Sequence, residues 1–397
     1  MGKIYDAIVD DLHGLGYDFR INDLDDTMQV SHKDGPWQPI NEETESTIRM
    51  DLRELGYGKR RKPSLSTVKD AWVKLASEQR HNPIKEYFLS LEGIYEPGAG
   101  VPYINELFCK FFDNPDGMFS TWLFKWMTGA IAKVFEGARN PMLVIISEQR
   151  QGKSYFSRWL CPINRDKYFI EKSIQPDSKD DKFRLIDKLV WEVPELTATT
   201  TRQNSDSLKA FLTTRQITER KSYGKYPIHK KAACSFIGSV NYDGAGFLND
   251  PTGSTRFLAC ELREINFGYT IQPVKELWAE AYWFYKNVHK CWELSPEQQT
   301  RQAQINSSFQ MVSALEEAIE NYFDITHDDS HFLTTQQIKN NLYGKHTIGN
   351  ENGFYRELSR ILHRLGVNKT RRSFQEGKPH YRGWSGIKIR PTEESEK

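Results

Sequence analysis

The segment that says most about the fold of this chain is Ser147-Glu-Gln-Arg-Gln-Gly-Lys-Ser154. It follows Met142-Leu-Val-Ile-Ile, which has the length and composition of a buried strand, and it precedes Tyr155-Phe-Ser-Arg-Trp-Leu, which favours a helix. In such an arrangement, loop N–H groups and the N-terminus of the helix point at phosphate oxygens. A strand, a loop ending in Gly-Lys-Ser and a helix therefore predict a phosphate-binding loop (P-loop).

Each part of this loop has an expected role with ATP and Mg²⁺. Lys153 supplies a positive charge for the β- and γ-phosphates, and Ser154 supplies a hydroxyl ligand for Mg²⁺. The candidate nucleotide-binding residues are Gln149, Arg150, Gln151, Gly152, Lys153, Ser154 and Tyr155. Ser147 stands where the motif G-x-x-x-x-G-K-[ST] has its first Gly, and a Ser fits there if its φ is negative.

A second apolar run, Lys188-Leu-Val-Trp-Glu-Val-Pro-Glu, carries carboxylates at its end. One carboxylate can hold the Mg²⁺ shell while another polarises the attacking water. We expect Glu192 to bind Mg²⁺ with Ser154, and both Glu192 and Glu195 are catalytic candidates. Because the two acids are spaced E-x-x-E rather than adjacent, the sequence does not decide which of them is the catalytic acid. Two surface glutamates at a strand end are the alternative.

Two later residues complete the candidate catalytic set. Asn241 ends a third apolar run, where a polar side chain can orient water and sense the γ-phosphate. Arg256 follows the turn Asp250-Pro-Thr-Gly-Ser-Thr and is suited to reach a nucleotide bound by a neighbouring subunit, as an arginine finger. A surface ion pair is the alternative for an isolated Arg.

The chain is expected to contain three domains around an α/β core. Short apolar runs alternate with helical stretches from Met142 to about Leu262, which is typical of a buried sheet. Residues 1–136 are predicted to be mainly helical, beginning with a helix over residues 4–15 and a hairpin. Residues 137–310 form the P-loop domain, and residues 311–397 read as three helices, a basic hairpin and an acidic tail, which is the winged-helix pattern.

The composition excludes several classes of protein. The chain has 397 residues, and its five cysteines are scattered, with no Cys-x-x-Cys. A zinc site or a disulfide framework is therefore not expected, and a reducing compartment fits. No apolar run approaches the roughly 18–20 residues of a membrane span, and the acidic N-terminus does not resemble a signal peptide. We expect a cytoplasmic protein with no membrane partner.

The near-neutral total of 54 Lys+Arg against 53 Asp+Glu conceals two basic blocks. Residues 209–231 hold seven Lys/Arg and one Glu, and residues 331–390 hold twelve Lys/Arg and three Glu. Residues 1–36, in contrast, hold eight Asp and three Lys/Arg. Two basic blocks beside recognisable elements indicate local anionic partners, with a solvated charged surface as the alternative.

Seven collinear segments between about residues 80 and 260 carry a resemblance to a known family. They are residues 82–92, 141–154, 191–196, 208–213, 219–225, 236–241 and 247–257. Together they resemble the virulence-associated E family of phage and mobile-element proteins, which is related to superfamily 3 helicases and to poxvirus-type primase-helicases.

The resemblance implies an AAA+-like ATPase core that assembles as a ring, usually a hexamer, and translocates on single-stranded DNA in a bacterial host cell. ATP would bind between subunits. Lys153 and Ser154 would be the Walker A pair, and Glu192 and Glu195 the Walker B acids. Asn241 would be the sensor and Arg256 the trans-acting finger. This chain departs from the family at Ser147 and at Thr255, where the family often has a second Arg.

The resemblance also suggests how DNA is held. In superfamily 3 helicases, a hairpin between the Walker B and sensor strands projects into the ring channel, and here that stretch is basic. Its candidate DNA-binding residues are Arg220, Lys221, Lys225, His229, Lys230 and Lys231, although Arg220 and Lys221 could instead contact nucleotide. In the C-terminal domain the basic candidates are Arg356, Arg360, Arg364, Lys369, Arg371, Arg372 and Arg382, for single-stranded or forked DNA. A solvated hairpin and a protein-interaction module are the respective alternatives.

Three functions remain open at this point. The first is an ATP-dependent, ring-forming DNA helicase in phage or mobile-element replication. The second is a DNA-binding P-loop ATPase that acts as an initiator or loader without unwinding, and the third is a nucleotide-binding regulator without turnover. A metabolic kinase would leave the basic segments without a role. Related helicases are often fused to a primase-polymerase, and none is visible here, so we expect a stand-alone helicase or the C-terminal part of a longer protein.

Overall fold

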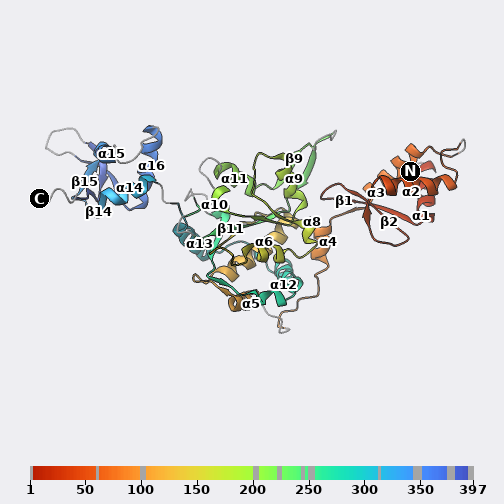
Figure 1. Ribbon diagram of the computed structural model, residues 1–397, viewed down its shortest axis with the longest axis horizontal. Coiled ribbons are helices and arrows are strands. Elements are labelled where there is room, and N and C mark those ends of the chain that lie inside the picture. Colours follow the sequence, from red (N-terminus) through yellow and green to blue (C-terminus); the bar gives the residue numbers. More distant parts are fainter. Residues whose placement is uncertain are drawn as a thin grey trace. The chain divides into compact units, whose positions relative to one another are not determined.

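The computed structural model describes residues 3–59, 62–98, 104–199, 205–220, 226–242, 246–248, 255–311, 314–342, 351–372 and 381–391. The chain divides into two compact units, Met1–Gln310 and Met311–Lys397 (Figure 1). In these described ranges, no helix has both the length and the apolar composition that crossing a membrane requires.

The first unit begins with a small α+β region that has its own core. Its elements are α1 (Lys3–Gly14), β1 (Tyr17–Asn22), β2 (Met28–His32), β3 (Gln38–Pro39), α2 (Glu42–Glu54), α3 (Leu65–Glu78) and β4 (Arg80–His81). The strands form a sheet in the order β3-β2-β1-β4, and Phe19 of β1 stacks on Trp72 of α3 in the core. The predicted first helix and the β2–β3 hairpin are confirmed. Strand β1 was not predicted.

The centre of the first unit is a five-stranded sheet. Its strands are β6 (Met142–Ser147), β7 (Phe169–Glu171), β8 (Val190–Val193), β11 (Ser235–Asn241) and β12 (Phe257–Glu261), in the order β12-β6-β11-β8-β7. All four pairings are parallel. Every residue of β6 is buried, as expected for a parallel strand covered on both faces. The predicted α/β core with a buried sheet is therefore confirmed.

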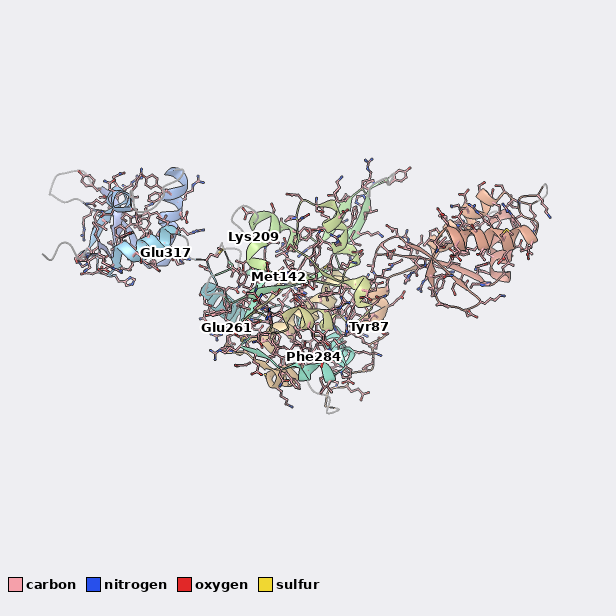
Figure 2. The ribbon with its side chains drawn as sticks, in the orientation of Figure 1. Tyr87, Met142, Lys209, Glu261, Phe284 and Glu317 are labelled. Carbon is pink, nitrogen blue, oxygen red and sulfur yellow. The ribbon has the colours of Figure 1, made fainter. Side chains whose placement is uncertain are left out.

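Helices and small β-pairs surround this sheet. They are α4 (Pro83–Leu89), α5 (Ile104–Phe111), β5 (Phe112–Asp113), α6 (Phe119–Glu136), α7 (Lys153–Leu160), α8 (Arg165–Tyr168), α9 (Lys179–Asp187), α10 (Leu196–Thr199), α11 (Ser205–Leu212), β9 (Gln216–Glu219), β10 (Ile228–Lys231), β13 (Glu264–Ile265), the 3₁₀ helix η2 (Phe267–Ile271), α12 (Val274–Asn287) and α13 (Pro296–Ser308). Figure 2 shows Tyr87 of α4 and Phe284 of α12 in the same body as Met142, the first residue of β6.

The domain boundary that we expected between residues 136 and 137 falls inside one hydrophobic core. Trp126 of α6 packs on Trp278 of α12 with ring centroids 6.2 Å apart, and its indole N–H donates to the carbonyl of Phe236 in β11 at 2.8 Å. Both Trp side chains are fully buried in the cluster that also contains β6. The change in sequence composition at residue 137 marks the start of the sheet, and helices α4, α5 and α6 before it share the core of the sheet.

The described residues of the second unit form three helices and five short strands. Its elements are α14 (Ala314–Tyr322), β14 (Phe323–Ile325), β15 (Phe332–Thr334), α15 (Thr335–Leu342), α16 (Glu351–Arg364), β16 (Asn368–Arg372), β17 (Tyr381–Ser385) and β18 (Ile387–Ile389). The predicted helices and the antiparallel hairpin β16–β17 are confirmed, and β15 adds a third strand beside β17. Assignment to the winged-helix class stays a prediction, and the acidic tail lies outside the described residues.

Candidate functional site

The loop at residues 148–152 lies between strand β6 and helix α7, and the sequence predicts both of these elements. Ser147 is the last residue of β6, so its backbone is extended and a side chain is accommodated at this position. Arg150 has a φ of 66° and Gly152 a φ of 88°, which turns the chain into the first residue of α7. A Cβ added to Gly152 would lie 2.5 Å from Cζ of Phe267, so a glycine is required both by the backbone and by this close contact.

Lys153 is a buried cation held by oxygen atoms. Its Nζ donates to the carbonyls of Ser147 and Glu148 at 3.0 and 2.8 Å, to Oγ of Ser147 at 3.0 Å and to Oδ1 of Asn241 at 3.1 Å. All four acceptors are neutral. The residue is 8% exposed, and burial lowers the pKa of its ammonium group, while the nearby Glu192 opposes this shift.

Ser154 and Glu192 form a second contact in this site. The hydroxyl of Ser154 donates to Oε1 of Glu192 at 2.7 Å. Glu192 is fully buried, and within the described part of the chain its Oε2 has no hydrogen-bond partner. Burial raises the pKa of its carboxyl group to about 7, and the negative charge of Glu171 adds to this shift, while Ser154, Ser239 and Lys153 oppose it.

The strand order explains why these residues meet. Strand β11 lies between β6 and β8, with Asn241 level with Ser147 and Gly238 level with Val193. The carboxyl ends of the three strands therefore share one edge of the sheet, which is where α/β folds bind ligands. Glu195 lies in the turn after β8 with a φ of 48°, and its side chain is exposed at the same edge.

A pocket of about 370 Å³ lies at this edge of the sheet, and the buried Glu192 is not among its lining residues. The lining residues are Arg150, Gln151, Gly152, Lys153, Ser154, Tyr155, Pro194, Glu195, Ser239 and Asn241. Of the candidate nucleotide-binding residues, Gln149 is exposed and does not contribute to the lining. Ser239 was not identified from the sequence, although a polar residue inside the apolar run of β11 is a signal that could have identified it.

Arg256 lies at the other end of the sheet. It immediately precedes β12, whose first residue Phe257 is level with Met142, the first residue of β6. At about 3.3 Å per residue, the length of β6 separates this level from Ser147 by roughly 16 Å. The structure therefore does not bring Arg256 to the loop of its own chain. Its Nε is buried and, in the ranges that the structure covers, has no hydrogen-bond partner.

The predicted basic hairpin is present as β9 and β10, which pair antiparallel. Lys221 and Lys225 lie outside the described residues. Arg220 and Lys231 are exposed, and the His229 ring lies 3.1 Å from the hydroxyl of Thr218. Lys230, a candidate for DNA binding from the sequence, has partners within the protein. Its Nζ forms an ion pair with Asp26 and donates to the carbonyl of Asp23 at 2.5 Å.

The basic residues of the second unit also separate into two groups. Arg364 forms an ion pair with the largely buried Glu316, and Arg372 donates to the carbonyls of Ser330 and Asp329 at 3.1 and 2.8 Å. These two residues therefore have intramolecular roles. Exposed side chains are those of Arg356 and Arg360 on α16, Lys369 and Arg371 on β16, and Arg382 on β17. Arg371 and Arg382 are direct cross-strand partners, an arrangement of like charges that a bound anion would stabilise.

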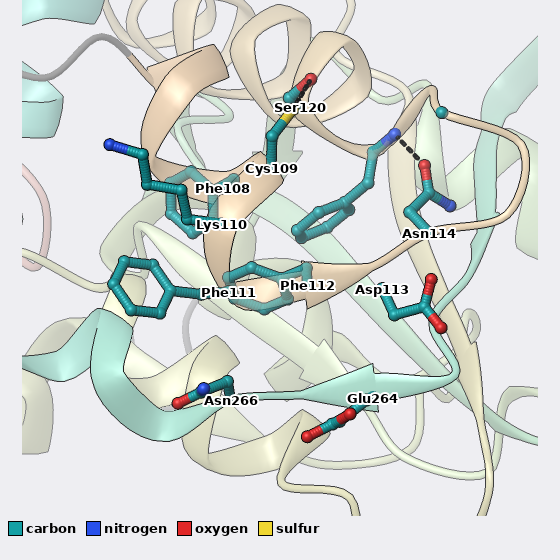
Figure 3. Close-up of a pocket in the computed structure, with 12 residues that line it drawn as sticks. Phe108, Cys109, Lys110, Phe111, Phe112, Asp113, Asn114, Ser120, Glu264 and Asn266 are labelled. Carbon is teal, nitrogen blue, oxygen red and sulfur yellow. Dashed lines mark hydrogen bonds between the residues drawn. The ribbon is translucent and has the colours of Figure 1, made fainter.

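A second pocket, of about 430 Å³, is lined by aromatic and acidic side chains (Figure 3). It is lined by aromatic residues of α5 and by the β5–β13 pair, where the carboxylates Asp113 and Glu264 are cross-strand partners. Both carboxylates are exposed at its rim. Because like charges repel, this rim disfavours phosphate, and the loop at the end of β6 is the better candidate for an anion.

A family model for the virulence-associated protein E-like domain matches residues 92–311. The chain belongs to this family. The match covers the whole parallel sheet, the loop of Lys153, the acidic strand with Glu192, and Arg256. The small α+β region and all helices and strands of the second unit lie outside the matched residues of this VapE-like domain.

Two solved structures of the NrS-1 C-terminal region, residues 305–718, are similar to the chain. The apo structure is 14% identical with a TM-score of 0.49, and the A-form apo structure is 13% identical with a TM-score of 0.50. Each comparison covers 97% of this chain and 100% of the other. At such low sequence identity, the similarity to the A-form apo structure concerns the fold alone. No curated protein matches the sequence.

Proposed function

We propose that this VapE-like chain is an ATP-hydrolysing DNA helicase that forms a ring on single-stranded DNA during phage or mobile-element replication. The observation that carries the proposal is the buried Lys153, whose ammonium group is held by neutral oxygens beside the Ser154–Glu192 contact. An initiator or loader that hydrolyses ATP without unwinding is the competing function, and the experiment below separates the two.

The surroundings of Lys153 fit an anionic ligand. Removing an ammonium group from water is costly, and none of its four hydrogen-bond acceptors carries a negative charge. Phosphate oxygens placed in the adjoining pocket would supply that charge. The loop N–H groups at the start of α7 and its helix dipole favour an anion in the same place.

The Ser154–Glu192 pair fits Mg²⁺. A hydroxyl and a carboxylate are the hard oxygen ligands that this cation prefers, and Oε2 of Glu192 is a buried acceptor with no partner among the described residues. When bound there with ATP, Mg²⁺ would neutralise charge on the β- and γ-phosphates. We assign Glu195, which is exposed in the pocket, to the polarisation of water, and Asn241 to the orientation of that water.

The position of Arg256 supports a ring. An arginine at the opposite end of the sheet is too far from its own loop to stabilise the transition state there. We assign it to the nucleotide of a neighbouring subunit, where its guanidinium would lie against the γ-phosphate. ATP bound between subunits would make hydrolysis depend on assembly, and a hexamer is the expected ring.

We assign DNA binding to the basic side chains that remain exposed. These are Arg220 and Lys231 on the hairpin, and Arg356, Arg360, Lys369, Arg371 and Arg382 in the second unit. They would contact phosphates and read no sequence. A primase-polymerase, as a separate protein or domain, is the further partner that we propose.

Strand displacement tests this function directly. Wild-type protein is mixed with a forked duplex, Mg²⁺ and ATP, and the release of a labelled strand is followed beside that of Glu192→Gln. We expect displacement by the wild type, none with a non-hydrolysable ATP analogue, and none by the variant. DNA-stimulated hydrolysis without displacement would contradict the helicase and support an initiator or loader.

A further inference from the structure

Two exposed aromatic side chains lie beside the phosphate-binding loop. Tyr155 on α7 is 55% exposed and Phe267 on η2 is 49% exposed. Their ring centroids are 5.7 Å apart at an interplanar angle of 60°. Neither ring takes part in the phosphate, Mg²⁺ or arginine-finger chemistry, so their placement needs another explanation.

The Phe267 ring is fixed from the protein side. It lies against Gly152 so closely that a Cβ there would be 2.5 Å from its Cζ. It also stacks on the buried Tyr269 at 6.2 Å, and Tyr269 in turn packs edge-on against Trp159 of α7 at 4.8 Å. This aromatic series runs from the core to the loop and holds the last ring in one orientation.

The short helix that carries Phe267 is itself anchored. The side-chain oxygen of Asn266 accepts from the backbone N–H of Gly268 at 2.9 Å, and the backbone N–H of Asn266 donates to the carbonyl of Phe111 at 2.8 Å. A Cβ on Gly268 would lie 2.6 Å from the Phe111 ring, so this contact also depends on glycine. The Phe267 ring is therefore supported from the protein side, and the Tyr155 ring packs against it.

We propose that Tyr155 and Phe267 form the nucleobase site for the nucleotide whose phosphates the loop binds. This inference rests on the proposed function. Tyr155 lines the phosphate pocket and contacts Phe267, so the aromatic surface adjoins the place where the phosphates end. An exposed ring held rigidly beside an anion site suits the flat face of a base.

Stacking predicts a particular specificity. It does not depend on hydrogen bonds to the base edge, so purine nucleotides such as ATP and GTP should bind alike. Pyrimidine nucleotides should bind more weakly, because a single ring offers less area to stack.

The test compares a ligand that has a base with one that has none. Binding of ATP and of inorganic tripolyphosphate is measured by calorimetry for the wild type and for Tyr155→Ala combined with Phe267→Ala. We expect the double variant to bind ATP roughly tenfold or more weakly, with tripolyphosphate binding unchanged. Phe267→Trp combined with wild-type Tyr155 should keep ATP affinity. Ile271→Ala is the matched control, since Ile271 ends the same short helix and is 83% exposed.

Three results would overturn the base site. If the double variant loses affinity for ATP and for tripolyphosphate equally, the rings support the loop and do not bind a base. If it keeps its affinity for ATP but loses affinity for single-stranded DNA, the rings stack on DNA. If it keeps affinity for all of these ligands, the base binds elsewhere. Wild-type protein that binds neither ATP nor tripolyphosphate would refute the proposed function, and the base site with it.

Discussion

Glu192 is the residue with the most unusual environment in the site. Its carboxyl group is buried at the end of β8, and burial raises its pKa from 4.5 to about 7. The folded protein therefore holds this proton more tightly than the unfolded chain does. The resulting stabilisation is present below about pH 4.5 and is lost as the pH rises through about 7.

Glu192→Gln should remove this pH dependence. Between about pH 5 and pH 8, the free energy of unfolding of the nucleotide-free wild type should fall relative to that of the variant by at most about 3 kcal/mol. The cause is ionisation of a carboxyl group that is poorly solvated in the fold. Urea denaturation of both proteins across this range measures the difference. A difference that does not change with pH would contradict the assigned environment of Glu192.

Lys153→Ala should lower ATP hydrolysis without lowering the thermal stability of the fold. ATP hydrolysis should fall by at least about a hundredfold, because the charge at the phosphates is lost. The thermal unfolding midpoint should stay the same or rise, because the substitution removes a buried cation. Phosphate release and thermal denaturation measure the two effects. Lys275→Ala, at an exposed position, is the control. Hydrolysis close to the wild-type rate would exclude Lys153 from the chemistry.

Among the elements, the hairpin β9–β10 contains a lysine, Lys230, whose surroundings in the structure differ from the role expected from the sequence. Six residues of this stretch, including Lys230 and Lys231, are candidates for DNA binding from the sequence. The ion pair of Lys230 with Asp26, 204 residues earlier in the chain, gives that lysine a structural partner. Lys231 extends from the same strand and is exposed.

Lys231→Ala should therefore weaken DNA binding more than Lys230→Ala. We expect the affinity for single-stranded oligonucleotides to fall alike for every sequence, and the salt dependence to flatten by about one counterion. Lys230→Ala should have a smaller effect, since its charge already pairs with Asp26. Fluorescence anisotropy at several salt concentrations measures both variants. A larger loss for Lys230→Ala, or a loss confined to certain bases, would refute this assignment.

Local patterns made most elements of the α/β core predictable. The apolar runs of β6, β8, β11 and β12 and the loop at Lys153 follow from residues within a few positions of one another. The sheet order does not, because the placement of β11 between β6 and β8 depends on long-range pairing. For the same reason, the sequence could not show that Asn241 contacts Lys153 or that Arg364 pairs with Glu316. The three-residue strand β7 is too short to leave a periodic signal.

For the whole molecule, the proposed ATP hydrolysis depends on assembly into a ring. Arg256→Ala should lose hydrolysis while keeping ATP binding, because the arginine serves a neighbouring site. Mixing this variant with Lys153→Ala should restore part of the activity, since some interfaces in a mixed ring contain both intact residues. Phosphate release from mixtures measures this effect. Mixed assemblies that form and stay inactive would contradict an arginine acting between subunits.

The most direct test of the central claim is ATP hydrolysis with and without single-stranded DNA, on protein whose mass in solution is followed by light scattering. We expect that DNA stimulates hydrolysis and that the active protein has the mass of a ring. A protein that remains a monomer and hydrolyses no ATP in the presence of DNA and Mg²⁺ would contradict it.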